Sequence, residues 1–522
     1  MDLLKKNIRM LRQKSKAVSQ ITLEEDMNVS DTRPDAGSII QESGVIKIED
    51  TKVMDHYIML NGYLEAKILY VSDTEGRQIH RLDTRVPFEE KLNLEGVSVG
   101  DNVGVKWDIE DLNVRLIHSR KMNIQAVVTF RASIDELYDT EAAVELRGMD
   151  EVSIRTKELQ PLSLMVQKKD TLRIKDEITL ASNKPNIGEL LWESVQLRGT
   201  DVRVQEGHLD VRGELFLFIL YSGDDENGTK QWIETALPFQ GSIDCSGGTS
   251  SMIPDVEISL GEASLEVRPD YDGEERLIQL EALLNLDIRI YEEESVEILA
   301  DVYSPLRELV PIRKEEVYES LIVKNFSKCR SSQHLRMELN QPRMLQICHS
   351  KGEVRIDETR IVENGILVEG AVYVGILYIT SDDVRPFALM RGVVPFQQIV
   401  EVNKINKNCR FSLKTELEQL STMMIDSEEI EVKVSVNLGL LIVQVHQEGC
   451  IAEVEEHELD MRKIQQLPGI VGYIVQPGDT LWNIAKTYYT SPERIRELNG
   501  LEAEEVKPGN RLIIVKDAAK IH

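Results

Sequence analysis

The amino-acid sequence predicts a mainly β protein with three tandem homologous β-rich domains, followed by a small βααβ module. Three observations predict this fold. A set of landmark residues recurs three times, apolar segments in each copy alternate with polar residues, and the last part of the chain has a different pattern. A chain of 522 residues is also too long for one hydrophobic core.

The landmarks of each copy are an early proline, a glycine followed after five residues by Ile-Leu-Tyr, and a later Pro-Phe pair. They occur at identical offsets, with the glycine at Gly62, Gly213 and Gly370. The prolines are Pro34, Pro185 and Pro342, the tyrosines are Tyr70, Tyr221 and Tyr378, and the pairs are Pro87-Phe88, Pro238-Phe239 and Pro395-Phe396. The period of roughly 150 residues is that of a domain and exceeds any solenoid repeat.

These spacings divide the chain as follows: a basic N-terminal arm (1–14), three repeats (15–155, 156–315 and 316–455), a linker (456–472) and the C-terminal module (473–515). Within the repeats, segments such as Val211–Tyr221, Val368–Thr380 and Ile430–Val445 have the apolar or alternating pattern of strands. Turn-forming residues after each Ile-Leu-Tyr predict the same hairpin in every copy.

The landmarks have structural interpretations. A glycine inside a strand indicates a bulge or a close backbone approach. The Ile-Leu-Tyr is expected in the core, with the tyrosine hydroxyl at a wet edge. The Pro-Phe pair is expected to begin an edge strand, with its phenylalanine filling the core. None of these residues is expected to bind a ligand.

The first 20 residues carry six basic side chains against one acidic one. Leu4, Ile8 and Leu11 have helical spacing, so a short amphipathic helix is possible. Such a segment is expected to be solvated or to pack on its own domain, and binding to a membrane surface is the minor alternative. The segment lacks the apolar region of a secretory signal, which predicts a cytoplasmic protein.

The net charge of −29 argues against a nucleic-acid partner, which would need a basic face for phosphates. No apolar run approaches the length of a membrane-spanning helix. Five widely spaced cysteines without a C-x-x-C pair predict buried or incidental thiols rather than disulfides or a zinc site.

The C-terminal module has a strand at Tyr473–Val475, then a turn and a helix capped by Asp479 or Thr480. A second helix starts at Ser491-Pro492 and stops at Asn499-Gly500. We expect Ile495 and Leu498 to face inward on it. A turn at residues 507–510 leads into a final strand at Leu512–Val515.

This pattern closely resembles the LysM family. The signature comprises Gly478-Asp479-Thr480-Leu481-Trp482, Ile484-Ala485, Tyr488, Leu498-Asn499, Pro508-Gly509 and Leu512. The resemblance implies a groove for N-acetylglucosamine-containing glycans between the first strand–helix loop and the second helix–strand loop. Carried over, the groove residues are Gly478, Asp479, Thr480, Leu481, Asn499, Gly500 and Leu501. Trp482, Ile484 and Leu498 are expected in the core.

The whole arrangement resembles the SipL-type family of spore-coat morphogenetic proteins, whose repeats are similar to the coat (SPOCS) domain of SpoVID- and CotE-type proteins. The resemblance implies a protein of the mother-cell cytoplasm that localises at the forespore surface and in the spore coat. It implies as partners a coat ATPase of the SpoIVA type, docked largely through LysM, and other coat proteins.

The sequence shows none of the phosphate-binding, hydrolase or metalloprotease motifs, and Cys348-His349 is interpreted as incidental, so we expect no enzyme, no cofactor and no metal. Two alternatives to a scaffold stay open. The module could anchor the protein on peptidoglycan of the cortex or cell wall, or the repeats could contain a wall hydrolase. A single module and the lack of an export signal favour a protein ligand in the groove.

Overall fold

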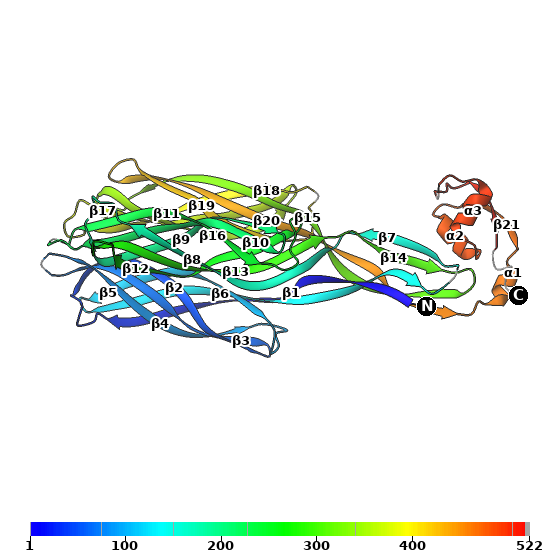
Figure 1. The fold of residues 1–522 in the computed structure, drawn as a ribbon, viewed down its shortest axis with the longest axis horizontal. Coiled ribbons are helices and arrows are strands. Elements are labelled where there is room, and N and C mark those ends of the chain that lie inside the picture. Colours follow the sequence, from blue (N-terminus) through cyan, green and yellow to red (C-terminus); the bar gives the residue numbers. More distant parts are fainter. Residues whose placement is uncertain are drawn as a thin grey trace.

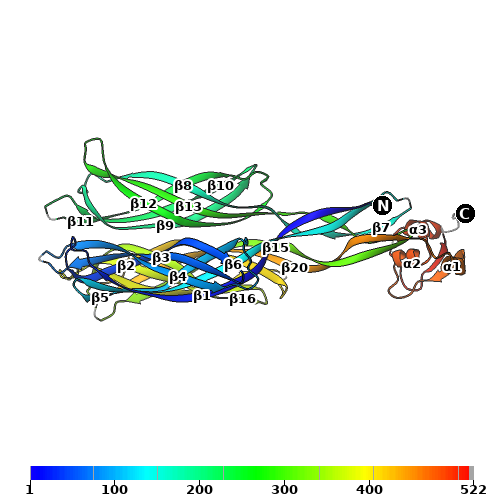
Figure 2. The same ribbon diagram turned by 90° about the horizontal axis from the view of Figure 1, so that it is seen from below.

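In this computed structural model the described residues are 2–516, except Glu75, Asp150, Asn227, Asn340, Lys404 and Glu504. The three repeats lie side by side, and a narrow stalk joins them to the C-terminal module (Figure 1). Viewed from below, the second repeat covers the other two from one side (Figure 2). The predicted β fold with a threefold repetition is confirmed.

Each repeat is built around two antiparallel three-stranded sheets that enclose a core. In the first repeat the strand orders are β1-β6-β5 and β2-β3-β4. The strands are β1 (Asp2–Asn28), β2 (Ala36–Met54), β3 (Tyr57–Ser72), β4 (Ile79–Asn93), β5 (Val103–His118) and β6 (Lys121–Arg147). Every other residue of the central strand β3 is buried up to Ile68, as expected for a strand with one face on a core, and the last five residues, 68–72, are all buried.

The other two repeats reproduce this plan with sheets β12-β13-β8 and β11-β10-β9, then β15-β20-β19 and β16-β17-β18. In the second repeat the first strand and the central strand of one sheet are interrupted, and the separated ends pair as β14-β7. Its strands are β7 (Ser153–Leu159), β8 (Leu162–Thr179), β9 (Ile187–Gln205), β10 (His208–Gly223), β11 (Lys230–Asp244), β12 (Ile253–Pro269), β13 (Glu275–Glu293) and β14 (Val296–Tyr303). The third has β15 (Glu308–Arg336), β16 (Met344–Val362), β17 (Gly365–Thr380), β18 (Phe387–Glu401), β19 (Cys409–Met424) and β20 (Glu429–His457).

The landmark glycine and the landmark phenylalanine form a cross-strand pair in every repeat. Gly62 lies opposite Phe88, and the same register joins Gly213 to Phe239 and Gly370 to Phe396. On the other side of each glycine the ladder has a bulge, which confirms the predicted role of the glycine. The Pro-Phe pairs lie on the edge strands β4, β11 and β18, but in the middle of each strand and not at its start as predicted, because an outward-facing edge needs no donor from proline.

The landmark tyrosine is fully buried, so the prediction of a hydroxyl at a wet edge is wrong. Its hydroxyl instead donates a hydrogen bond to the carbonyl of the early proline. The three bonds measure 3.1 Å for Tyr70 to Pro34, 3.2 Å for Tyr221 to Pro185 and 3.2 Å for Tyr378 to Pro342. The bond satisfies a polar group that burial would otherwise penalise, and it explains why both residues recur.

The leucine between the isoleucine and the tyrosine has a different surrounding. Isoleucine and tyrosine point into the core of their own repeat. Leu69, Leu220 and Leu377 point the other way and meet in one apolar cluster shared by the three repeats. This shared cluster also contains Ile40, Leu191 and Cys348, which occupy equivalent positions. The repeats therefore pack as an internal trimer within one chain.

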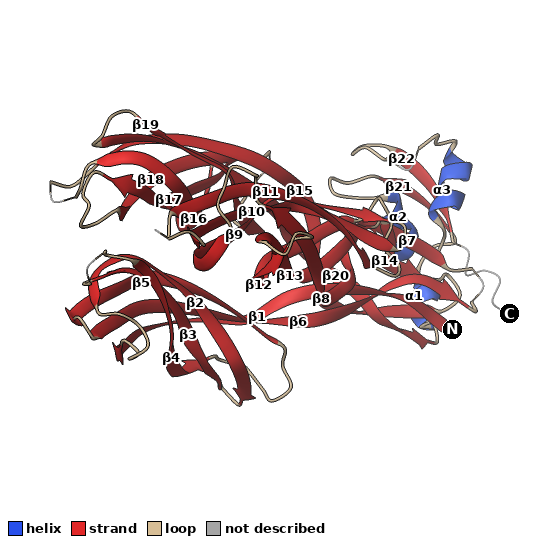
Figure 3. Cartoon of the chain, turned by 60° about the vertical axis from the view of Figure 1, so that its left-hand side comes forward, coloured by secondary structure: helices blue, strands red, loops and turns tan. Residues whose placement is uncertain are grey.

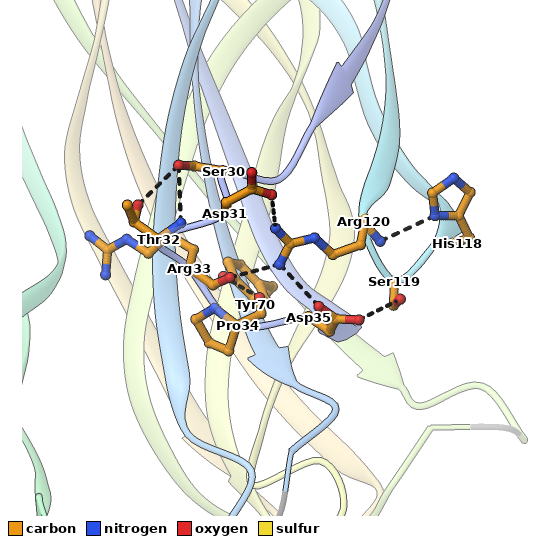
Figure 4. A network of polar contacts seen from close by, with 10 residues as sticks. All are labelled: Ser30, Asp31, Thr32, Arg33, Pro34, Asp35, Tyr70, His118, Ser119 and Arg120. Carbon is orange, nitrogen blue, oxygen red and sulfur yellow. Dashed lines mark hydrogen bonds and ion pairs between the residues drawn. The ribbon is translucent and has the colours of Figure 1, made fainter.

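The far end of the first repeat is closed by a network around Arg120, next to the Tyr70–Pro34 bond (Figure 4). Arg120 donates to the carbonyl of Arg33 at 2.9 Å and pairs with Asp35 at 3.0 Å and Asp31 at 2.8 Å. In the second repeat Arg276 binds Asn186 at 2.7 Å. In the third repeat the charges are exchanged, with Arg343 paired to Glu428 at 3.0 Å.

The stalk consists of the first and last strands of the three repeats. β1 and β6 pair over nearly their whole length, and so do β15 and β20. Together with β7-β14 they enclose two small cores to which all three repeats contribute, with Ile8, Val296 and Cys450 in one and Ala143, Val302 and Ile451 in the other. The predicted boundaries at residues 155 and 315 fall inside β7 and β15.

The N-terminal residues form the beginning of β1, so the helix considered for residues 1–20 does not form and 1–14 is not a free arm. Partners more than a hundred residues away override the local spacing, because the ladder with β6 satisfies the backbone. The basic side chains face acidic ones on β6, as in Lys5–Glu141, Arg9–Asp139 and Arg12–Glu136. These pairs account for the basic character of the segment without a membrane.

The C-terminal module contains β21 (Ile470–Ile474), α2 (Leu481–Thr487), α3 (Pro492–Asn499) and β22 (Arg511–Val515), preceded by α1 (Met461–Gln466) in the predicted linker. Its helices are the blue elements beyond the stalk in Figure 3. The βααβ prediction is confirmed. Among the described residues, no helix has the length and apolar character needed to cross a bilayer.

The five cysteines are free and buried, as predicted. Burial raises the pKa of the Cys348 thiol to about 12, so at neutral pH it is not the thiolate that a nucleophile requires. In the described part of the chain, no cluster of His, Cys, Asp and Glu could hold a metal ion.

Candidate functional site

The two helices of the C-terminal module are fixed by the caps that the sequence predicts. The Thr480 side chain accepts from the backbone N–H of Asn483, and Ser491 accepts from that of Arg494. Pro492 opens α3, and Gly500 ends it in the left-handed region with φ 63°. The predicted groove loops, 478–481 and 499–501, therefore flank the two helices at defined positions.

Three of the predicted groove residues, Asp479, Leu481 and Asn499, hold the module together. Asp479 accepts hydrogen bonds from the Tyr473 hydroxyl and the Gln476 N–H, both at 2.7 Å. Leu481 is 2 % exposed and belongs to the core of the module. The Leu481 side chain is thus closed to a ligand, whereas Asp479 is half-buried and uses only its Oδ2 in these two bonds.

Asn499 has a similar structural task. Its amide donates to the carbonyls of Ile495 and Ile513 and accepts from the Ile513 N–H. The side chain thereby pairs with β22 as a neighbouring strand would, and it ties α3 to the sheet. A substitution of Asn499 would disturb the fold of the module before it tested any ligand.

The other predicted groove residues are available at the surface. Gly478, Thr480 and Gly500 are exposed, and Leu501 is half-buried against the module core. Gly478 has φ 92°, so its position in the loop also requires a glycine. The residues that face solvent come from both loops, as a groove between them would need.

The predicted core residues of the module fall into three cases. Ile484 is buried, as expected. Leu498 is 48 % exposed, so the prediction that it faces inward is wrong: on α3 the inward positions are Pro492 and Ile495, and Leu498 lies off that face. Trp482 is half-buried against the module core, and it also contacts Asp301 and Tyr303 of the stalk.

The module is docked on the end of β14, and we call this contact the latch. Trp482 Nε1 donates to Asp301 at 2.8 Å, and Lys486 Nζ reaches the same carboxylate at 2.9 Å. Tyr303 lies edge-on against Trp482, with ring centroids 4.9 Å apart, and its hydroxyl donates to the Thr490 carbonyl at 2.8 Å. The latch uses α2 and the loop after it, and it leaves the two groove loops exposed.

The electrostatics of the latch depend on Asp301. Burial raises the pKa of this carboxyl, but the bonds from Trp482 and Lys486 outweigh burial and hold the pKa below its usual value. Arg313 adds a further positive charge at 3.4 Å. The carboxylate is thus charged at neutral pH and satisfied from both sides of the contact.

Sequence reasoning missed the latch residues Asp301 and Tyr303. They lie in an ordinary strand of the second repeat, where an acidic residue and an aromatic one carry no special signal. Trp482 offered one clue, since a tryptophan N–H that is covered by protein needs an acceptor. Its acceptor, however, lies 181 residues away in the chain.

Comparison with protein families adds an independent finding. The family model described as "SipL, SPOCS domain" matches three times, at residues 35–117, 186–268 and 343–425, and the LysM domain model matches residues 473–515. No curated protein and no solved structure gives a significant match. The three SPOCS matches fall on the three repeats, and the LysM match begins at Tyr473 within β21 and ends with β22.

Proposed function

The chain is a SipL-type protein, with three SPOCS domains followed by one LysM domain, and on this basis we propose that it is a non-enzymatic scaffold of spore-coat assembly. In this proposal the LysM domain docks a coat morphogenetic ATPase of the SpoIVA type. The three SPOCS domains hold the docked partner at a fixed distance from other coat proteins, at the forespore surface.

The observation that supports this proposal best is the combination of the latch with the exposed groove loops. The SPOCS trimer and its stalk form a long β body, and the LysM domain is attached to the end of that body by α2. Gly478, Thr480 and Gly500 are left exposed. A module held in this way presents its binding loops outward, which suits a scaffold that must orient a partner.

The proposal is tested with substitutions that change the groove loops without removing a structural bond. Thr480→Asp retains an N-cap acceptor, and Gly500→Asn retains a residue that tolerates the left-handed region. We expect each to weaken capture of the purified ATPase by the full-length chain at least tenfold. Glu497→Gln, on the exposed side of α3, is the matched control and should bind as the parent does.

An ATPase that binds a chain carrying both Thr480→Asp and Gly500→Asn as tightly as the parent chain would contradict docking through this groove. The second candidate function, anchoring on peptidoglycan, is favoured by the LysM match itself, since most LysM domains bind N-acetylglucosamine-containing glycans. Co-sedimentation of the full chain with purified cortex fragments separates the two. Sedimentation that is lost in Thr480→Asp, together with an ATPase that does not bind, would replace the first candidate by the second.

A further inference from the structure

The third SPOCS domain carries a group of exposed apolar residues at its end opposite the LysM domain (Figure 1). Leu339 is fully exposed, and Val384, Met423 and Ile425 are about half-exposed. These four residues, which we call the distal patch, lie at or beside the β15–β16, β17–β18 and β19–β20 loops. Single exposed apolar residues are common on protein surfaces, but four on neighbouring loops of one domain indicate a contact surface.

The three loops are joined to one another through their backbones. The Met337 N–H donates to the Glu428 carbonyl at 2.9 Å, which ties the β15–β16 loop to the β19–β20 loop. The Ser381 N–H donates to the Arg343 carbonyl at 3.0 Å, which ties the same loop to the β17–β18 loop. The distal patch is thus presented on a connected frame, so a partner has less conformational freedom to remove when it binds.

The first and second domains have polar residues at the main positions of the distal patch. Equivalent positions are identified by the offset from the landmark proline for Leu339, and by the paired residue on the central strand for Met423. Leu339 is replaced by Asp31 and Ser182, and Met423 by Arg115 and Glu266. The fold does not require apolar side chains at these positions, so the reason for them in the third domain lies outside the fold.

The charges around the distal patch leave an excess of free carboxylates. The arginines there are all paired: Arg336 with Glu429 at 3.3 Å, Arg343 with Glu428 at 3.0 Å, and Arg385 with Asp382 at 3.3 Å. Glu338, Asp383 and Asp426 are exposed and form no ion pair with any residue that the structure describes. The apolar surface is therefore bordered by negative charge, which complements a partner that carries positive charge.

We propose that the distal patch docks a protein segment whose apolar side chains are flanked by lysine or arginine. The flexible Met423 side chain can adapt to the apolar residues of such a segment, and the free carboxylates receive its basic ones. A second copy of this chain is disfavoured, because it has a net charge of −29 and would bring the same carboxylates together.

An anionic membrane surface is disfavoured as the occupant because the free carboxylates repel it. The distal patch and the LysM groove lie at opposite ends of the molecule, so both can be occupied at once. The proposal does not depend on what the LysM groove binds.

The chemistry of the occupant is tested by selecting phage-displayed random dodecapeptides on the immobilised full-length chain. Phages that also bind a chain carrying both Leu339→Ser and Met423→Ser are removed first. We expect the enriched peptides to combine apolar residues with lysine or arginine. No enrichment over the double variant, or enrichment of acidic or uncharged peptides, would overturn the proposal.

Synthetic copies of the enriched peptides then serve as probes in fluorescence anisotropy with the full-length chain. The double variant should weaken binding at least tenfold, and circular dichroism verifies that it is folded, as expected for two exposed positions. Ile117→Ser is the matched control, because it removes a half-exposed isoleucine at the place of Ile425 in the first domain, and binding should be unchanged.

A second pair of substitutions tests the charges without touching the apolar residues. Glu338→Gln together with Asp383→Asn should weaken binding about threefold and reduce its dependence on salt. Unchanged affinity in both double variants would overturn the proposal. Self-association of the parent chain in sedimentation equilibrium, or its flotation with vesicles that contain phosphatidylglycerol, would also overturn it if Leu339→Ser with Met423→Ser abolishes the effect.

Discussion

The SPOCS domains and the LysM domain are both marked by short sequence signatures, but these signatures mean different things. In the SPOCS domains every landmark is accounted for by the fold. The glycine pairs with the phenylalanine, the tyrosine binds the proline carbonyl, and the leucine joins the shared cluster. In the LysM domain one signature contains both structural residues, such as Asp479, and exposed ones, such as Gly478.

The difference shows what repetition within one chain can teach. Three copies with different surfaces retain only what the fold requires, so a residue present in all three is a structural residue. A module that occurs once offers no such comparison, and its binding residues cannot be separated from its scaffold by sequence alone. The separation needed the hydrogen bonds of Asp479 and Asn499.

The largest effect should come from the landmark glycines. A Cβ on Gly62 would lie 2.1 Å from the carbonyl oxygen of Lys47, which is backbone and cannot move aside. We expect Gly62→Ala to destabilise the chain by about 4 kcal/mol or more, measured by thermal unfolding. Gly213→Ala is the matched control, since its Cβ meets chiefly the end of the Phe239 ring at 2.8 Å, and we expect about 1 to 2 kcal/mol.

Similar unfolding temperatures for these two variants would show that the close backbone approach is not what requires the glycine. The structural interpretation of the SPOCS signature would then depend on the tyrosine–proline bond and the shared leucine cluster alone.

The next effect concerns the shared cluster. Leu220→Ala removes a fully buried side chain from the junction of the three domains and should cost about 3 kcal/mol. The space left by the Leu220 side chain lies between the three domains. Its removal should therefore also increase hydrogen exchange at the ends of β3, β10 and β17 together. Leu137→Ala, half-exposed on the stalk, should cost less than about 1 kcal/mol.

Increased exchange confined to the second domain after Leu220→Ala would contradict a common junction. The SPOCS domains would then behave as separate units that touch.

The smallest effect is expected at the latch. The pKa of Asp301 is below its usual value in the folded chain, so its charge stabilises the latch above the unfolded pKa of about 4, and this stabilisation is lost as the pH falls through the folded pKa. Asp301→Asn should weaken the latch by about 1 to 2 kcal/mol at neutral pH and abolish its pH dependence. Trp482 fluorescence and proteolysis between residues 458 and 469 measure the release.

A parent chain whose latch holds at pH 3 as firmly as at pH 7 would exclude Asp301 as its electrostatic centre. Tyr303→Phe, which retains the ring contact with Trp482, is the control for the apolar part of the contact.

Much of the fold could be predicted because strands, repeats and helix caps are recognised from residues that are close together in the sequence. Alternation gave the β-strands, identical offsets gave the domains, and the caps Thr480 and Ser491 placed the helices of the LysM domain. What failed depended on distant partners. The segment around Ile8 has helical spacing yet pairs with β6, and the landmark tyrosine finds a proline carbonyl that spacing alone does not identify.

The candidate sites divide in the same way. The groove residues remain a prediction from the LysM signature, and the signature could not show that the Leu481 side chain is buried. The latch could not be predicted, since Asp301 acquires its role only when the LysM domain lies against it.

The arrangement of three SPOCS domains in one polypeptide also fixes a stoichiometry. Separate subunits would form such a trimer only above a certain concentration, and each subunit would bring its own LysM domain. In this chain the trimer persists at any dilution, because its members are covalently joined, and it carries a single LysM domain on one of three stalk ribbons. If the LysM domain docks a coat partner as proposed, each docking event therefore brings three β-domains, in a ratio set by the chain itself.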